Sequence, residues 1–334
     1  MLIAASLILF FGCKKNIPDD RDSLGNEVDY SIKEFNPTLG RKSHYDNAVY
    51  VGTNTSKPLT FTLVNVRTSN GDPAPELTDK FPVKVWKKEY TGEEKTLAEI
   101  EEKRAIEYRS MLEIGVNSGS VMFWESGNSN FVKTVPDSGY VFDVQIENSG
   151  GRKFVRNLKV KPYKEMPYTP SVYNSVTGVA LNSYVYPSRA VNLYGERDPI
   201  FSSSIHVFFH KDEENKTPGS SLTFSFLDSL NNPIDPMVFN GTDWDNLVHG
   251  FDRKLVNNKM VYTVAYPMPM IQKKTKYTTA DGFLSSAVFK YNRVGFGGFR
   301  QESELGIDFG IYEEGHWEIQ FRFREETPKF EDEK

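Results

Sequence analysis

The sequence is short of cysteine and of positive charge, and both shortages restrict what the protein can do. Its 334 residues include one Cys, so no disulfide can form within the chain. The 40 Lys and Arg residues are outnumbered by 45 Asp and Glu residues, which leaves a net charge of -5. Because nucleic-acid-binding proteins usually carry a basic excess, DNA and RNA are poor candidates as partners.

Familiar catalytic motifs are missing as well. The chain has no G-x-S-x-G, P-loop or H-E-x-x-H motif. His206 and His210 form an H-x-x-x-H pair, but they lie in IHVFFHK (205–211), which has the composition of a strand. Four residues of strand span about 13 Å, too far for two ligands of one zinc ion. A glycosidase needs two facing carboxylates, which sequence alone cannot choose among 45 acidic residues. We therefore expect a protein that is not an enzyme and has no cofactor.

The one long apolar run lies at the amino terminus. It extends from Leu2 to Gly12, which is shorter than the roughly 20 residues of a membrane-spanning helix but typical of a secretory signal core. Cys13 follows directly, and Lys14 and Lys15 come next. This arrangement resembles a bacterial lipoprotein signal, which implies that residues 1–12 are a signal peptide and that Cys13 is the lipid attachment site. The alternative is a buried amino-terminal strand with an incidental Cys.

A polar, acidic segment separates Cys13 from the first expected strand. Residues 13–29 include Asp19, Asp20 and Asp22 and few apolar residues, a composition that favours a flexible tether. Acidic residues behind a lipidated cysteine resemble the surface-export signal of Bacteroidetes lipoproteins. The resemblance implies an outer-membrane protein, lipid-anchored and facing the cell surface. An ordinary solvated linker, and an anchor facing the periplasm, remain open.

Beyond the tether, short β-like runs alternate with turn signals. Polarity alternates clearly at 140–147, where the inward row is Tyr140, Phe142, Val144 and Ile146. The sequence Asn-Ser-Gly-Gly at 148–151 predicts a hairpin turn. On the return strand we expect the inward row to continue as Phe154, Leu158 and Val160.

The segment before this hairpin carries a fold signal. Asp137-Ser138-Gly139-Tyr140 resembles the tyrosine corner of the immunoglobulin fold. We therefore expect residues 30–163 to form an immunoglobulin-like β-sandwich. One exception is the segment 96–112, whose apolar residues fall at helical spacing and predict an inserted surface helix.

The second half of the chain predicts another β unit. Three prolines in 161–174 mark a domain boundary in an otherwise β-rich chain. We expect a second β-sandwich at 164–326 and a disordered tail at 327–334. The fold class is thus all-β, with two tandem β-sandwich domains. In the second, Trp317, Ile319, Phe321 and Phe323 should form an inward row that faces Leu305, Ile307, Phe309 and Ile311.

Two tryptophans are candidates for ligand binding. In the polar loop 231–252, Trp244 stands between Asp243 and Asp245. Carboxylates beside an indole ring can hold a stacked sugar, or the two carboxylates can bind Ca²⁺. The alternative is a turn whose Trp packs on the core.

Trp86 is the other candidate. It lies opposite the apolar row of Phe81, Val83 and Val85, on a face shared with lysines. Such an aromatic residue can be a sugar platform, an interdomain contact or a cover over the segment that follows.

Anchor, tether, tandem β units and high aromatic content together resemble uncharacterised Bacteroidetes outer-membrane lipoproteins that are associated with starch-utilisation-like glycan uptake systems. The resemblance implies non-catalytic capture of a polysaccharide or oligosaccharide beside outer-membrane transporter proteins. Its residue basis is Trp86, Asp243, Trp244 and Asp245. Two alternatives remain: a structural or assembly lipoprotein that binds a partner protein, and a glycoside-active enzyme. Burial of Trp86 and Trp244 would remove the residue basis for glycan capture.

Overall fold

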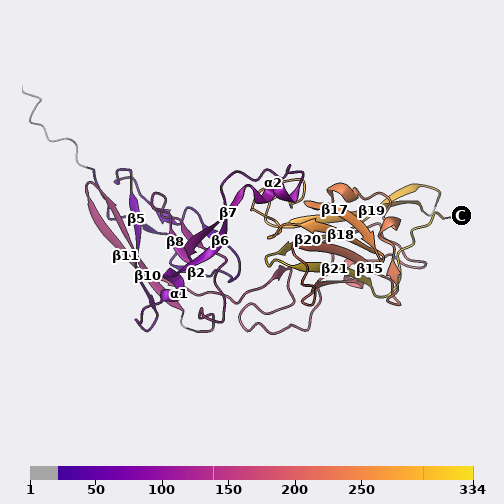
Figure 1. Cartoon of the computed structure of the whole chain (residues 1–334), viewed down its shortest axis with the longest axis horizontal. Helices are drawn as coiled ribbons and strands as arrows, with labels where there is room; N and C mark the ends of the chain where they lie inside the picture. Colours follow the sequence, from indigo (N-terminus) through magenta and orange to yellow (C-terminus); the bar gives the residue numbers. More distant parts are fainter. Residues whose placement is uncertain (1–21, 138, 296, 334) are drawn as a thin grey trace, which may run out of the picture.

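The computed structural model describes residues 22–137, 139–295 and 297–333. The predicted signal peptide, Cys13 and most of the tether lie outside these residues. The chain forms an elongated molecule of two β units that follow one another along its long axis (Figure 1). Buried apolar residues form one core between Val28 and Val160 and another between Tyr168 and Phe323. The prediction of an all-β chain with two tandem sandwich units is confirmed.

The first unit contains two main sheets and a pair of short strands. One sheet has the order β2-β11-β10-β5, the other β3-β9-β8, and β1 pairs with β4. The bounds are β1 Asp29–Tyr30, β2 Glu34–Phe35, β3 Ser43–Tyr45, β4 Val49–Tyr50, β5 Thr60–Thr68, β8 Leu112–Ile114, β9 Val121–Phe123, β10 Tyr140–Asn148 and β11 Gly151–Val160. A four-residue helix, α1 (Pro75–Thr78), follows β5 and buries Leu77.

The hairpin of β10 and β11 forms at the predicted turn, but a β-bulge changes its inward row. Phe142 pairs with Leu158 and Val144 with Val155, so one residue of β10 lies opposite two of β11. Consequently Val155 is buried, whereas Phe154, predicted to face inward, is 39% exposed. Asp143 stabilises the bulge because its Oδ1 accepts the backbone N–H of Asn157 at 2.8 Å.

Tyr140 behaves as the tyrosine-corner resemblance implies. Its ring is buried, and its hydroxyl accepts the backbone N–H of Lys133 at 2.7 Å. This bond runs from the start of a late strand back to the loop a few residues upstream, which is the arrangement found in immunoglobulin-like sandwiches.

Between β5 and β8 the first unit extends an arm, residues 80–110. It consists of β6 (Lys80–Trp86), α2 (Leu97–Glu101) and β7 (Arg104–Ser110). The prediction of a helix over 96–112 is therefore wrong beyond its first turns. Residues 104–110 pair with the whole of β6. Ile106 lies opposite Lys84 and Tyr108 opposite Pro82, so both lie on the face away from Val83 and Val85. Helical spacing and strand alternation overlap in this segment, and pairing with β6 decides between them.

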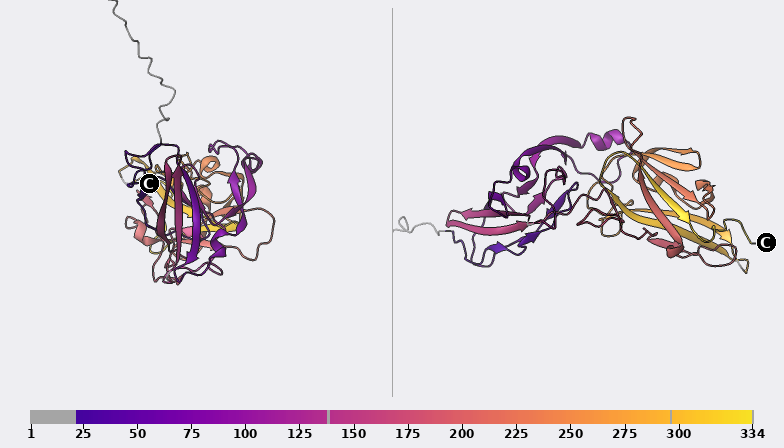
Figure 2. Two further views of the ribbon diagram at one scale, coloured as in Figure 1. Left: turned by 90° about the vertical axis from the view of Figure 1, so that its left-hand side faces the viewer. Right: turned by 90° about the horizontal axis from the view of Figure 1, so that it is seen from below.

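The arm carries α2 across to the second unit, as two perpendicular views show (Figures 1 and 2). Thr96 caps the helix by accepting the Glu99 N–H at 3.2 Å, and the Glu99 carboxylate accepts the Lys95 N–H at 2.8 Å. Ile100 of α2 then packs with Ala265 and Met270 of the second unit. The two units are thus joined by apolar packing as well as by the chain.

The second unit is a sandwich of a six-stranded and a four-stranded sheet. The larger has the order β14-β21-β15-β18-β17 with β16 beside β15, and the smaller has β12-β20-β13 with β19 also paired to β20. The bounds are β12 Tyr168–Thr169, β13 Arg189–Val191, β14 Ile205–Lys211, β15 Ser221–Leu227, β16 Pro233–Ile234, β17 Gly250–Val256, β18 Lys259–Val264, β19 Ser285–Val294, β20 Arg300–Ile311 and β21 His316–Phe323. Three 3₁₀ helices lie in its loops: η2 Ser202–Ser204, η3 Pro236–Val238 and η4 Trp244–Asn246.

Aromatic rings fill the space between these sheets. Phe289 of the smaller sheet contacts Phe226 and Phe321 of the larger, with ring centroids 4.9 and 5.4 Å apart. The predicted inward rows of β20 and β21 are both buried, and they belong to opposite sheets.

The tail differs from the predicted disorder. Phe330 packs between Phe239 and Tyr291, with ring centroids 5.3 and 4.8 Å apart. Nearby, the Lys329 N–H donates to the Tyr194 carbonyl at 2.8 Å. A single apolar ring in a charged segment is sufficient to dock the tail on the core.

Candidate functional site

Trp244, a predicted ligand contact, lies in the core. Its ring is 6% exposed and its centroid is 5.6 Å from that of Phe289. The short helix η4 turns the side chain inward, and the Trp244 carbonyl accepts the Tyr262 hydroxyl at 2.6 Å. The interpretation as a turn whose Trp packs on the core therefore describes this loop.

The two carboxylates beside Trp244 have different partners. Asp243 Oδ2 accepts from the Asn246 side-chain amide at 2.9 Å, and Asp245 Oδ1 accepts from Arg253 Nε at 2.8 Å. Within residues 22–333, apart from 138 and 296, no group of three or more His, Cys, Asp or Glu side chains is placed to hold a metal ion. These contacts give no support to the predicted Ca²⁺ at Asp243 and Asp245.

Trp86 lies between the two units. Its ring centroid is 5.3 Å from that of Tyr90, and the guanidinium carbon of Arg104 lies 5.4 Å from it. Arg104 also donates through Nη1 to the Tyr266 carbonyl of the second unit at 2.8 Å. Of the three roles that the sequence left open for Trp86, the geometry matches the interdomain contact.

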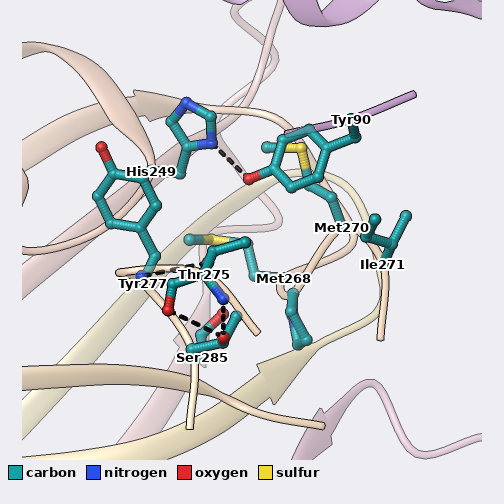
Figure 3. A pocket seen from close by; sticks show the side chains of 10 residues that line it. Tyr90, His249, Met268, Met270, Ile271, Thr275, Tyr277 and Ser285 are labelled. Atoms are coloured by element: carbon teal, nitrogen blue, oxygen red, sulfur yellow. Dashed lines mark hydrogen bonds between the residues drawn. The ribbon is translucent and has the colours of Figure 1, made fainter. Parts of the chain in front are cut away.

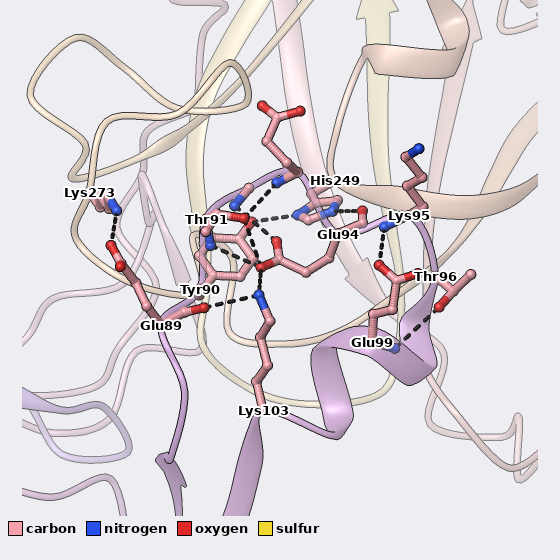
Figure 4. Close-up of polar contacts among 12 residues, drawn as sticks. Glu89, Tyr90, Thr91, Glu94, Lys95, Thr96, Glu99, Lys103, His249 and Lys273 are labelled. Carbon is pink, nitrogen blue, oxygen red and sulfur yellow. Dashed lines mark hydrogen bonds and ion pairs between the residues drawn. The ribbon is translucent and has the colours of Figure 1, made fainter.

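An enclosed polar cluster lies between the units. We call it the joint and define it as Tyr90, Glu94 and Lys103 of the arm together with His249 of the second unit (Figure 4). His249 Nε2 lies 2.7 Å from the Glu94 carbonyl, and Nδ1 lies 2.5 Å from the Tyr90 hydroxyl. Because a carbonyl only accepts, Nε2 carries the proton and Nδ1 accepts from Tyr90. Both rings are at most 5% exposed, so the cluster is part of the interior.

The charges of the joint are set by burial and by hydrogen bonds. Burial lowers the pKa of His249 below its usual 6.5, which favours the neutral ring. Burial by itself raises the pKa of Glu94, but the Lys103 ammonium and the Thr91 N–H lower it to about 2. Glu94 also accepts the Gly92 N–H at 2.9 Å, so its carboxylate organises the loop of the arm.

A cavity beside the joint is too small for a ligand. It has a volume of about 10 Å³ and is lined by side chains that include Tyr90, His249, Met268 and Tyr277 (Figure 3). Such a volume holds about one water molecule. The joint is therefore a structural contact between the units.

An open surface with ligand-binding chemistry lies on the edge strand β14 instead. Ile205, Val207 and Phe209 face the core, so the alternate residues point outward. Together with two tyrosines of the preceding loop they form what we call the aromatic row: Tyr184, Tyr186, His206, Phe208 and His210.

The rings of the aromatic row lie close together. Tyr184 stacks on His206 with centroids 3.7 Å apart, and Tyr186 meets the same ring edge-on at 5.7 Å. Phe208 and His210 are near parallel, with centroids 5.9 Å apart. Tyr184 and Tyr186 are 48% and 44% exposed, whereas His206, which Tyr184 covers, is 4% exposed. The row therefore presents ring surface to solvent through the two tyrosines, His210 and part of Phe208.

Hydrogen-bonding side chains of β21 flank the row. In the strand register Arg322 lies opposite His206, Gln320 opposite Phe208, and Glu318 opposite His210. Directly opposite residues share a face of the sheet. Rings on one strand and a guanidinium, an amide and a carboxylate on the next therefore form one surface.

The row ends at a polar groove. The loop 211–220 and the turn 314–316 line this groove, which has a volume of about 380 Å³. His316 closes one side, with Nδ1 2.9 Å from the Ser221 hydroxyl. An apolar strip thus leads into a polar recess on the same face of the sheet.

Comparison with known proteins identifies the family of the chain. The family described as "Domain of unknown function (DUF5007)" matches residues 50–332, which include most of both β units. The chain belongs to the DUF5007 family. No curated protein and no solved structure matches it. In this DUF5007 chain the arm, the joint and the aromatic row all fall within the matched residues.

The sequence contained a signal for the aromatic row. In IHVFFHK the positions 206, 208 and 210 are all rings, although they alternate with the core-facing residues. Ring side chains at every outward position of a strand are unusual for a solvated face. The strand spacing of His206 and His210 argues against a zinc site, and the same alternation puts both histidines on one face with Phe208.

Proposed function

We propose that this DUF5007 protein is a lipid-anchored, non-catalytic binding protein of the cell envelope, and that it captures a polysaccharide or oligosaccharide on the aromatic row. The observation that carries the proposal is the aromatic row, with Tyr184, Tyr186 and His210 exposed and Phe208 half-buried, beside the polar side chains of β21. The tryptophans predicted for this role do not support it, since Trp244 is buried and Trp86 lies between the two units.

The chemistry of a sugar fits such a surface. The faces of a sugar ring carry C–H groups that pack on aromatic rings, while its hydroxyl groups need hydrogen-bond partners at the rim. From His206 to His210 the row is about 13 Å long at about 3.3 Å per residue. This length suits a short stretch of a glycan chain better than a single sugar.

The side chains around the row favour binding over cleavage. Glycoside hydrolysis uses a pair of carboxylates about 5 to 10 Å apart. Glu318 is the carboxylate of β21 that borders the row, and it accepts from Ser225 Oγ at 2.5 Å and from Lys259 Nζ at 2.7 Å. A carboxylate that accepts hydrogen bonds from two neighbouring side chains is suited to hold those side chains in place rather than to transfer a proton to a substrate.

The location belongs to the same proposal. Lipidation of Cys13 would tether the two units to the outer membrane, with the row facing the cell surface beside transporter proteins of an uptake system. Among the residues placed by the structure, no helix is long and apolar enough to cross a membrane.

One observation favours a second candidate, an assembly lipoprotein that binds a partner protein. Ile106 and Tyr108 on the outer face of β7 are 66% and 67% exposed. Two large apolar side chains on an open two-stranded hairpin can add to an interface.

Affinity electrophoresis separates these candidates. The full chain in detergent micelles is run through native gels that contain one polysaccharide each. We expect retardation by at least one polysaccharide and its loss in Phe208→Ala, while Phe299→Ala, in an exposed loop of the other sheet, behaves like the wild type. Wild-type protein that no polysaccharide retards would contradict the proposal and leave the partner-binding role.

A further inference from the structure

We infer that the end of the aromatic row at Tyr184 is an anion subsite formed by Arg322 and Arg324, so that the captured glycan carries carboxylate or sulfate groups. This inference rests on the proposed function and adds the chemical class of the ligand.

The two arginines are placed side by side on the outer face. Arg322 lies in β21 opposite His206. Arg324 follows two residues later, and its backbone N–H donates to the Ser204 carbonyl at 3.0 Å, which continues the alternation past the end of the strand. Arg324 Nη1 lies 3.4 Å from His206 Nε2, and Arg322 lies opposite His206 in the strand register, so both arginines flank the residue that Tyr184 covers.

Neither arginine has an acidic partner. Throughout the portion of the chain that the structure describes, no ion pair involves Arg322 or Arg324, and Arg322 Nε is shielded from solvent with no hydrogen-bond acceptor. Three arginines of the second unit are paired: Arg189 with Glu304, Arg253 with Asp245, and Arg293 with Glu333. Arg197 and Arg300 have no ion pair among the described residues, but neither has a second arginine beside it on the same face of a strand. In a chain with more acidic than basic residues, two adjacent unpaired guanidinium groups form a local positive site.

The chemistry of the site selects the ligand. A guanidinium group binds the two oxygens of a carboxylate or a sulfate with parallel hydrogen bonds. Tyr184 and Tyr186, both about half exposed, supply ring surface next to these donors. A sugar that stacks on a tyrosine can therefore place its charged group over Arg322 or Arg324.

The opposite end of the row does not offer such a site. There Glu318 is paired with Lys259, and Lys211 is paired with Glu313. Burial lowers the pKa of His206, and the two arginines lower it further, so His206 is neutral and serves as an acceptor for Arg324. The positive charge at the Tyr184 end thus comes from the arginines.

Titration calorimetry with matched ligands tests the inference. The full chain in micelles is titrated with an oligogalacturonate, with its methyl ester, which is neutral, and with a sulfated oligosaccharide. We expect at least one charged ligand to bind about tenfold or more tightly than the ester, the gain typical of a hydrogen bond to a charged group. Arg322→Gln and Arg324→Gln should each reduce this preference.

The controls distinguish failure of the subsite from failure of the proposed function. Arg300→Gln, on the smaller sheet, should keep the preference, and Phe208→Ala should lose binding of charged and neutral ligands alike. Equal affinity for charged and neutral ligands, with binding still dependent on Phe208, would overturn the anion subsite and leave glycan capture in place. Absence of binding to every oligosaccharide would overturn both.

Discussion

The joint allows one quantitative prediction, for the variant Tyr90→Phe. This change removes one hydroxyl group and leaves the ring packing with Trp86 and His249 in place. His249 is 3% exposed, and in this variant its Nδ1 atom loses the Tyr90 hydroxyl as hydrogen-bond donor. A buried acceptor without a partner costs about 1–3 kcal/mol. Docking of the arm on the second unit should weaken by this amount.

Amide hydrogen exchange of the arm measures this loss. The population of the open state of a local segment is set by the free energy of opening, and a decrease of about 1.4 kcal/mol raises that population tenfold. Exchange at residues 87–103 should therefore accelerate about fivefold to a hundredfold in Tyr90→Phe, while exchange of β10 and β11 stays unchanged.

A matched control is the variant Tyr108→Phe. Tyr108 is 67% exposed, and no hydrogen bond of its hydroxyl occurs among the residues that the structure covers. This variant should exchange like the wild type. If the arm exchanged at the same rate in Tyr90→Phe and in the wild type, the hydrogen bond from Tyr90 to His249 would add nothing to docking, contrary to this prediction.

Three further predictions concern pH, the bulge and the anchor. Because the pKa of His249 is lowered in the folded state, its contribution to arm docking is fully present above pH 6.5 and declines as the pH falls below this value. In His249→Gln, arm docking measured by hydrogen exchange should therefore depend less on pH in this range. Glu94, whose pKa is lowered to about 2, affects docking only below about pH 4.5. An unchanged slope in that variant would exclude His249 as the titrating group. Asp143→Ala removes the acceptor of the Asn157 N–H and should lower the free energy of unfolding of the first unit by about 1–3 kcal/mol in urea titrations, and no change would show that the bulge does not need this bond. Cys13→Ala should abolish labelling with a radioactive fatty acid and move the protein from membrane to soluble fractions, and retained label would exclude Cys13 as the lipid site.

Alternation and turn chemistry predicted much of the fold because they are local. The β10–β11 hairpin and the rows of β20 and β21 follow from residues within one or two strands. The bulge at Asp143 was not predictable from alternation, since one extra residue shifts the register and exposes Phe154. The helix predicted at 96–112 failed for a tertiary reason, because its second half pairs with β6.

The candidate site depended on burial, which local patterns describe poorly. Trp244 was placed in a polar loop, yet the loop folds back and buries the ring against Phe289. Trp86 points away from Val83 and Val85, but the arm reaches the second unit, and packing between the two partly buries the Trp86 ring. The aromatic row adds two tyrosines from a loop about twenty residues before β14, and only the tertiary structure brings them to His206.

Binding of a glycan on the aromatic row can be tested by side-chain footprinting with hydroxyl radicals. The full chain is oxidised with and without each polysaccharide of a panel, and the oxidation of Tyr184, Tyr186 and Phe208 is compared with that of Phe299. Glycan capture on the row predicts that at least one polysaccharide protects these three residues and leaves the oxidation of Phe299 unchanged. Protection of Ile106 and Tyr108 in place of the row, or no protection by any polysaccharide, would contradict it.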